Sequence, residues 1–447
     1  MNLENSANDD KDQLLTLKAL RIQYQAEKNR NLRLKEIEEK RNKIEQISLF
    51  QNKANIELTQ KLEALYKELS YVEKLRSSQN REIKQFLSEI RKISLSDQKL
   101  FIWIVESTIL SLLLRLIIET KTFPFDLKHE ALWIIAITSN LKVNPDKAYQ
   151  FMKALIILAG DIYQLTKSNQ IFFLQKIIAS ITNFIIEKND LVSLIQNDRA
   201  LQRAVLVLIE DHDVKNVTLS LWFIRITLKA GKIGFEEILS DGSLQHAFIN
   251  TLKKYANEKD IVTELVWTLA HLSQIPCEYE ILGNELIFLV MQVAVHYDEG
   301  ILIPCLTVLG NSLTAMGSEG VLLFLQRTEL NDILKIGLVS NNFVVKRETL
   351  FLLSNLAANS EVSAEFILQK KDLVEFLIQI IINNEPYVYK EALYILSNLA
   401  SISESKYLGY MKENFPEISK IYDSLVNHQS AEEIQMLQEK LLSAFSS

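Results

Sequence analysis

The chain has 447 residues, of which 48% are hydrophobic, with only 11 Gly and 6 Pro. Residues that break secondary structure are too scarce for a β-rich fold with many tight turns, so we expect an all-α protein. The only two cysteines, Cys277 and Cys305, exclude a disulfide framework and favour a reducing compartment. The net charge of −7 argues against nucleic acid as a partner.

The N-terminal part is expected to be a basic helical arm in front of an acidic body. Residues 1–11 are polar and unlike a signal or transit peptide, and we expect them to be disordered. Residues 12–60 contain neither Pro nor Gly and are dense in charge, which indicates a solvated helix, a short coiled coil or a recognition arm; residues 61–80 would connect it to the body. The basic residues of this arm are Arg21, Lys28, Arg30, Arg33, Lys35, Lys40, Arg41, Lys43 and Lys53.

Residues 81–447 carry a helix signature that returns about every 43 residues. Its clearest copies, at 346–358 and 389–401, share the pattern Glu-x-Leu-aromatic-x-Leu-Ser-Asn-Leu-Ala. The signature positions are Ile137, Asn183, Ile226, His271, Asn311, Asn355 and Asn398, separated by 46, 43, 45, 40, 44 and 43 residues. One further step back falls within residues 88–94. This period is typical of armadillo and HEAT repeats, in which units of two or three helices stack into a solenoid.

The signature helix places an aromatic residue four positions before a polar one, so that both lie on one helix face. The complete pairs are Trp267 with His271, Phe351 with Asn355 and Tyr394 with Asn398. Trp133 and Trp222 have no polar residue four positions later. Carboxamides can bind both the N–H and the C=O of an extended peptide, and aromatic rings can form walls for its side chains. Alternatively, the Asn side chains bridge neighbouring helices and the rings fill the core. We favour peptide binding because three Asn residues recur in register.

No sequence pattern indicates catalysis. The chain has no Gly-rich phosphate loop, no Gly-x-Ser-x-Gly, and no Cys-x-x-Cys or His-x-x-x-His spacing, so we expect no catalytic residue, no cofactor and no metal site. The longest uncharged stretch, residues 300–318, contains Pro304, Gly310 and Asn311. Lipid would leave its polar groups unsatisfied, so we expect a buried core helix there and no membrane partner.

The repeat motifs resemble those of the importin-alpha family of nuclear import adaptors. The segments 352–358 and 395–401 are similar to the family's Trp-Ala-Leu-Ser-Asn-Ile-Ala, Val308 to Asn311 resembles its Val-Gly-Asn, and residues 417–440 resemble its last repeat. The resemblance is stronger over residues 260–445 than before them. It implies a right-handed armadillo superhelix of about eight to ten repeats that binds nuclear localisation signals in its concave groove, in the cytoplasm and the nucleus.

The resemblance also implies two peptide sites. The minor, C-terminal site would consist of Asn311, Glu348, Phe351, Asn355, Glu391, Tyr394 and Asn398, with the two Glu residues as acids for a cargo Lys or Arg. The major, N-terminal site would consist of Trp133, Asn183, Glu187, Trp222 and Trp267. This second site is eroded, because Trp133 and Trp222 lack their Asn partners and Ala179 stands where a Trp is expected before Asn183.

In the importin-alpha family a basic N-terminal helix binds importin-beta and otherwise folds back into the groove. The resemblance therefore implies three partners: cargo with basic localisation peptides, importin-beta at the arm, and an export receptor at the C-terminal repeat. Five Glu residues dilute the arm between residues 21 and 53. Two alternatives stay open: a cytoskeletal or ciliary armadillo scaffold that lost transport, and a nucleic-acid-binding helical repeat, which the acidic body disfavours.

Overall fold

A computed structural model gives the arrangement of the chain. It describes residues 60, 80–96, 101, 105, 109–118, 124–141, 143–162, 167–195, 198–230, 235–275, 279–314, 316–383, 385, 388–402 and 413–415. Every regular element in these residues is helical, as expected. The chain divides between residues 247 and 248 into two compact units, which we describe separately. The predicted arm residues from Arg21 to Lys53 and the C-terminal segment 417–440 lie outside the described residues.

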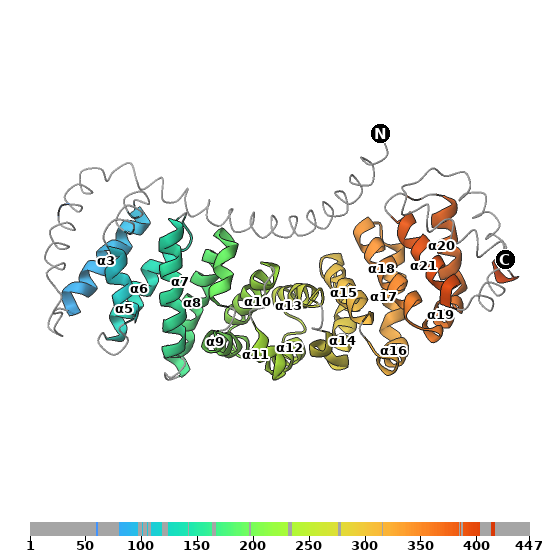
Figure 1. Ribbon diagram of the computed structural model, residues 1–447, viewed down its shortest axis with the longest axis horizontal. Coiled ribbons are helices and arrows are strands. Elements are labelled where there is room, and N and C mark those ends of the chain that lie inside the picture. The colour runs from blue at the N-terminus through green and yellow to red at the C-terminus, as the bar shows by residue number, and fades with distance from the viewer. Residues whose placement is uncertain are drawn as a thin grey trace, which may run out of the picture. The chain divides into compact units, whose positions relative to one another are not determined.

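The first unit contains a stack of helices with further helices packed along it (Figure 1). Its elements are α3 (Asn80–Ser96), α5 (Leu110–Ile118), α6 (Phe125–Thr138), α7 (Pro145–Ile162), α8 (Lys167–Glu187), η3 (Asn189–Leu194), α9 (Arg199–Ile209), α10 (Val214–Lys229) and α11 (Glu236–Ser240). Helices α3, α6, α8 and α10 pack against one another in that order, and we call them the first stack.

The second unit repeats this arrangement. Helix α12 (Ser243–Lys254) runs across the boundary between the units. The following helices are α13 (Lys259–Leu272), α14 (Tyr279–His296), α15 (Glu299–Leu313), α16 (Ser318–Leu325), α17 (Thr328–Val339), α18 (Phe343–Asn359), α19 (Glu361–Leu368), α20 (Lys371–Ile382) and α21 (Tyr389–Ile402). Helices α13, α15, α18 and α21 pack against one another in that order and form the second stack.

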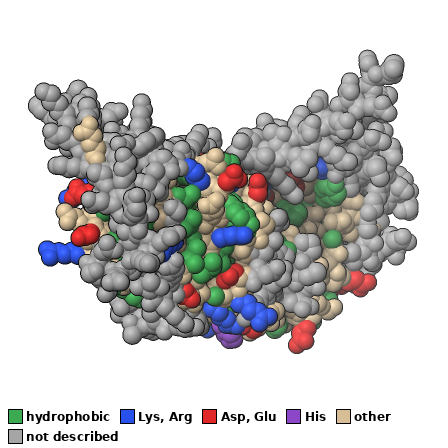
Figure 2. Space-filling model, turned by 60° about the vertical axis from the view of Figure 1, so that its left-hand side comes forward, with side chains coloured by type: hydrophobic (Ala, Val, Ile, Leu, Met, Phe, Trp, Pro, Cys, Tyr) green, Lys and Arg blue, Asp and Glu red, His purple; other side chains and the backbone are tan. Residues whose placement is uncertain are grey.

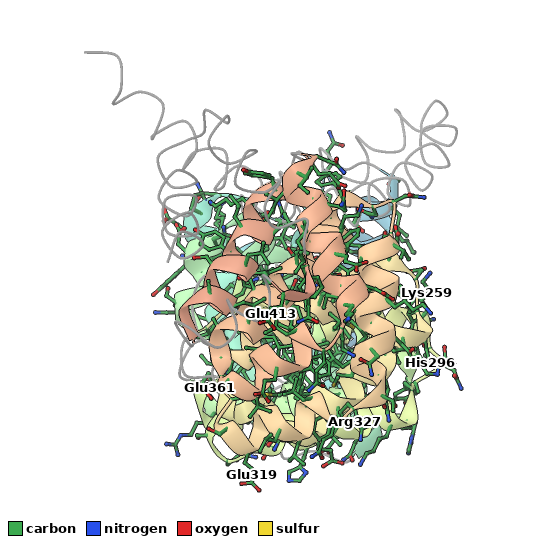
Figure 3. The ribbon with its side chains drawn as sticks, turned by 90° about the vertical axis from the view of Figure 1, so that its right-hand side faces the viewer. Lys259, His296, Glu319, Arg327, Glu361 and Glu413 are labelled. Atoms are coloured by element: carbon green, nitrogen blue, oxygen red, sulfur yellow. The ribbon has the colours of Figure 1, made fainter. Side chains whose placement is uncertain are left out.

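Side-chain caps determine where several helices begin. Asp198, Asp213, Asp298 and Asn342 each precede a helix, and each side chain accepts a hydrogen bond from a backbone N–H of its first turn. Such caps contribute about 1 kcal/mol each, because they satisfy N–H groups that have no partner within the helix. Asp298 also pairs with Lys259, which projects from the outer edge of the second unit (Figure 3).

The eight signature positions fall on the eight helices of the two stacks. Residues 88–94 lie in α3, and the later positions, from Ile137 to Asn398, lie in α6, α8, α10, α13, α15, α18 and α21 in turn. The apolar residues around them form the core; Phe86, Phe223 and Leu309 have at most 1% of their surface exposed. Each such residue contributes about 1.5–3 kcal/mol by burial, so the stacked helices stabilise one another.

The long uncharged stretch at 300–318 lies in the core of the second unit. It covers nearly all of α15 and the start of α16, and Leu302, Leu306 and Leu309 are buried. The prediction of a buried core helix is therefore confirmed. Among the described helices, none has the length and apolar character needed to cross a membrane.

Candidate functional site

Asn side chains link the successive helices of the second stack. The amide nitrogen of Asn355 donates to the carbonyl oxygen of Gly310 at 2.8 Å. The amide nitrogen of Asn398 donates to the carbonyl oxygen of Ser354 at 3.1 Å. Gly310 lies in the last turn of α15, where a carbonyl lacks its usual partner within the helix. The Asn residue of each helix thus binds the helix before it.

Only one side of each carboxamide is used in this way. Asn311, Asn355 and Asn398 are half-buried, and their hydrogen bonds within the described part of the chain are all donated by the amide nitrogen. The side-chain oxygen of each has no partner there. The bridging interpretation is therefore correct for the nitrogen, while the oxygen remains able to accept an N–H from an extended peptide.

The aromatic partners of these Asn residues lie beside them. Phe351 is 38% exposed, and its ring lies so close to Gly310 that a Cβ atom there would be 3.1 Å from two ring carbons. Tyr394 is half-buried, with the Lys390 ammonium 5.7 Å from its ring centre. Glycine at position 310 therefore lets the Phe351 ring lie directly on α15.

The two predicted acids differ in exposure, since Glu391 is half-buried and Glu348 is buried. Glu348 is 5% exposed and accepts a hydrogen bond from the Thr307 hydroxyl at 2.9 Å, with an Arg347 nitrogen 3.9 Å away. Burial raises the pKa of Glu391; the negative charge of Glu348 raises it further, and Arg347 and Lys390 lower it. A bound cation would therefore relieve repulsion between two carboxylates on neighbouring helices.

In the first stack, the one predicted Asn makes the same kind of bridge. Asn183 is 8% exposed, and its amide nitrogen donates to the Ser139 hydroxyl and to the Asn140 side-chain oxygen, both at 3.1 Å. Glu187, four residues later, is exposed at the end of α8. Asn183 therefore joins α8 to the end of α6, as Asn355 joins α18 to α15.

Trp133 is covered by a residue that the sequence analysis did not single out. The Lys176 ammonium lies 3.9 Å from the centre of the Trp133 ring. Lys176 stands seven residues before Asn183, which is the spacing of Glu348 from Asn355 and of Glu391 from Asn398. Aligning the signature helices at this position would have revealed it.

The remaining predicted residues are partly separated. Trp222 is half-buried on α10, in the first unit. Trp267 lies on α13, in the second unit, 6.4 Å from the His271 ring, and its ring N–H is buried without a partner among the described residues. Among these residues, no group of three or more His, Cys, Asp or Glu is arranged to hold a metal ion.

Comparisons with known proteins support the fold. No protein-family model and no curated protein matches the chain. The crystal structure of an engineered protein superposes with a TM-score of 0.60 at 15% identity, covering 86% of this chain and 99% of the other. A designed armadillo repeat protein in complex with the peptide (KR)4 gives 0.46 at 17% identity, over 54% of this chain and 98% of the other.

A second designed armadillo repeat protein gives a TM-score of 0.47 at 16% identity, over 54% of this chain and 98% of the other. At such identities the likeness concerns the fold alone. The stacked helices of the two units, their spacing of about 43 residues along the chain and the superposition with a TM-score of 0.60 identify the chain as an all-α, armadillo-like repeat solenoid.

Proposed function

We propose that the second unit binds an extended basic peptide along α13, α15, α18 and α21, and that the chain is an adaptor for nuclear protein import. The observation that carries the proposal is the row of carboxamide oxygens on Asn311, Asn355 and Asn398, which have no hydrogen-bond partner within the described part of the chain. Acceptors held in register on successive helices suit a ligand with regularly spaced N–H groups.

The spacing of the helices suits an extended ligand. Packed helices lie about 8–10 Å apart, and an extended chain advances about 3.3 Å per residue. One Asn would therefore bind the backbone about every three residues. Because the nitrogens of these Asn side chains bond the preceding helix, the acceptors are already oriented before the peptide arrives, which lowers the entropy cost of binding.

The preference for basic side chains would come from Glu348 and Glu391. Both lie one turn or less from the aromatic residues Phe351 and Tyr394 in the sequence, so a Lys or Arg could rest its apolar stem on a ring while its charge approaches a carboxylate. Pairing with a partly buried carboxylate contributes more than pairing at an open surface.

Transport would require a second contact, with importin-beta, at the basic residues between Arg21 and Lys53. The resemblance of the repeat motifs to importin-alpha supports this part, as it supports an export receptor at the C-terminal repeat and a location in the cytoplasm and nucleus. Importin-beta should be captured by the full chain and not by a chain lacking residues 12–60. Equal capture by both chains, or by neither, contradicts the adaptor role.

A second candidate function is an armadillo scaffold that binds peptides without importing them. One observation favours it: Lys176 covers the Trp133 ring, which belongs to the major peptide site implied by the resemblance. A scaffold would bind the basic peptide in the second unit but would not bind importin-beta. The two assays therefore separate the two functions.

The peptide site can be tested by titrating a fluorescein-labelled basic localisation peptide into the full chain and following its anisotropy. We expect the double variant Asn355→Ala, Asn398→Ala to bind at least about fivefold more weakly, because each lost hydrogen bond is worth about 0.5–1.5 kcal/mol. Asn359→Ala is the matched control. Asn359 also bridges helices, donating to the Leu313 carbonyl at 3.0 Å, but it is not a signature residue.

The control separates loss of the bridge from loss of the ligand contact. All three substitutions should lower the melting temperature by a similar small amount, whereas only those at 355 and 398 should weaken binding strongly. Unchanged affinity in the double variant would rule out this peptide site.

A further inference from the structure

Helix α8 of the first stack differs from α18 and α21 of the second in the charge at one register position. Seven residues before the signature Asn, α18 and α21 have Glu348 and Glu391, whereas α8 has Lys176. Helix α6 has Glu130 at this position, but Glu130 is already paired with Arg91. The stacks also differ as wholes: α3, α6, α8 and α10 contain ten Lys or Arg and five Asp or Glu. Helices α13, α15, α18 and α21 contain four and five.

Lys176 is held by aromatic rings. Its ammonium lies 3.9 Å from the centre of the Trp133 ring and 5.9 Å from that of Phe172. Phe172 is 37% exposed and stacks on the His129 ring with a centre-to-centre distance of 4.9 Å. A cation over a ring is attracted by the face of the ring but uses none of its N–H groups in a hydrogen bond. Lys176 is thus oriented, with donors available.

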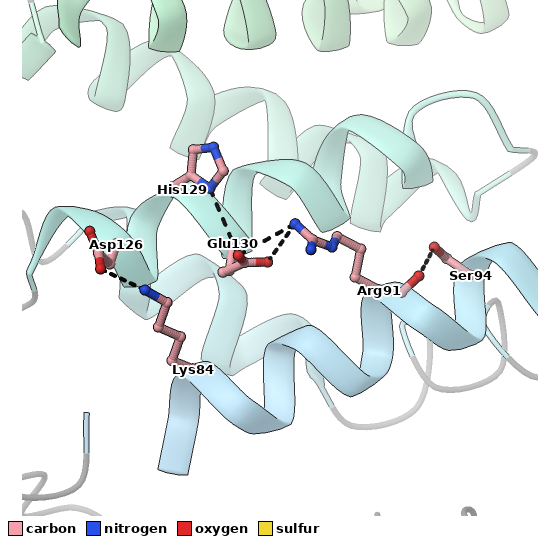
Figure 4. Close-up of polar contacts among 6 residues, drawn as sticks. All are labelled: Lys84, Arg91, Ser94, Asp126, His129 and Glu130. Atoms are coloured by element: carbon pink, nitrogen blue, oxygen red, sulfur yellow. Dashed lines mark hydrogen bonds and ion pairs between the residues drawn. The ribbon is translucent and has the colours of Figure 1, made fainter. Parts of the chain in front are cut away.

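The nearby acids are occupied by other cations (Figure 4). Asp126 pairs with Lys84 at 2.6 Å, and Glu130 pairs with Arg91 at 3.2 Å. Within the described part of the chain, no carboxylate lies within ion-pair distance of Lys176. Among these groups the positive charge of Lys176 is therefore left without a direct anionic partner.

The surroundings also disfavour a second cation at this place. Burial lowers the pKa of Lys176, and burial together with the charges of Arg91 and Lys176 lowers the pKa of His129. A basic peptide side chain would meet an ammonium already lying on Trp133. Figure 2 shows one face of the molecule, on which exposed hydrophobic side chains lie beside charged side chains of both signs.

We propose that the first unit binds an acidic segment of a partner protein, one of whose carboxylates pairs with Lys176 where that side chain lies on Trp133. The ring holds the Lys176 ammonium, and the N–H groups that point away from the ring donate to the carboxylate. Phe172 and His129 provide an aromatic edge for the apolar part of the ligand. The first unit would thus bind the opposite charge from the second, and this site does not depend on the basic-peptide site of the second unit.

The test is an anisotropy titration of the full chain with two labelled peptides, one of alternating Glu and Ala and one of alternating Lys and Ala. We expect Lys176→Met to weaken binding of the Glu peptide by about tenfold, because a charge-assisted hydrogen bond is lost. Lys176→Glu should weaken it further and should strengthen binding of the Lys peptide, since it restores an acid at the position of Glu348.

Lys153→Met is the matched control. Lys153 also lies over an aromatic ring, 4.6 Å from the centre of Tyr149, but it belongs to α7, outside the stack. It should leave the affinity for the Glu peptide unchanged. Lys176 is half-buried at the surface, so its variants should fold, and equal melting temperatures would verify this.

The basic residues between Arg21 and Lys53 also attract acidic peptides, so binding by the unaltered chain alone does not decide the question. The Lys176 variants leave those residues intact. Equal affinity of the unaltered chain, Lys176→Met and Lys176→Glu for the Glu peptide overturns the proposal, as does a failure of the unaltered chain to bind it.

Discussion

Asn183 in the first stack and Asn398 in the second make the same kind of bridge to the preceding helix, yet seven residues before each of them the charge is reversed. In the first stack this position holds Lys176, lying on Trp133; in the second it holds Glu391. The bridge joins neighbouring helices in both stacks. Under the two proposals above, the position seven residues earlier contacts the ligand, so packing and specificity would depend on different residues of one helix.

The largest expected effect comes from overpacking the contact between α17 and α18, a helix of the second stack. A Cβ atom at Gly337, on α17, would lie 2.0 Å from the Thr349 hydroxyl and 2.9 Å from two of its carbons, and Thr349 is fully buried on α18. Gly337→Ala should therefore lower the free energy of unfolding, measured by urea titration, by about 3 kcal/mol. It should also weaken binding of the basic peptide. Gly317→Ala is the control, because no atom lies within 4 Å of its Cβ position. Equal stability of the two variants would contradict this packing.

The two bridging residues provide a direct test of the comparison. Asn183→Ala and Asn398→Ala should each lower the free energy of unfolding by about 1 kcal/mol, since each loses a partly buried hydrogen bond. Only Asn398→Ala should lower the affinity for the basic peptide, by several-fold, in the anisotropy titration. If Asn183→Ala weakens that peptide equally, the two stacks do not differ in ligand.

A smaller effect is expected from pH. Because the pKa of Glu391 is raised in the folded protein above its ordinary value of 4.5, the folded chain binds this proton more tightly than the unfolded chain does. Its contribution to stability therefore falls as pH rises through the interval between the two pKa values. Binding of a cationic side chain requires the ionised form, so affinity for the basic peptide should fall as pH drops through the raised pKa.

This can be measured as the dissociation constant of the basic peptide between about pH 8 and about pH 5. Glu391→Gln should bind more weakly at the upper end and should vary less with pH. A pH dependence as large as that of the unaltered chain would show that Glu391 is not the responsible group.

Much of the fold could be predicted from the sequence, because stacked repeats place similar residues at a nearly constant spacing along the chain. The spacing from Ile137 to Asn398 identified a helix of each repeat, and the paucity of Gly and Pro excluded strands. The stretch at 300–318 was predicted to be a buried helix rather than a membrane span, because lipid would leave its polar groups without hydrogen-bond partners. Each of these inferences depends only on residues that are near one another in the sequence.

The candidate site was less predictable, because its contacts join residues about one repeat apart. The sequence marked Asn355 but gave no sign that its nitrogen would bind Gly310 and leave the oxygen available. It marked Trp133 but not Lys176, which reaches that ring from the next helix of the stack. A side chain that crosses between repeats is found only when the repeats are aligned position by position.

The Asn bridges join residues separated by 38 to 46 positions, which is about one repeat in every case. Within each unit these hydrogen bonds join neighbouring repeats, and they do not require residues far apart in the sequence to meet. Such a structure can assemble by adding one repeat to the next, with little loop-closure entropy to overcome at each step. During synthesis on the ribosome, each new repeat could therefore bind the preceding one as soon as its Asn has been made.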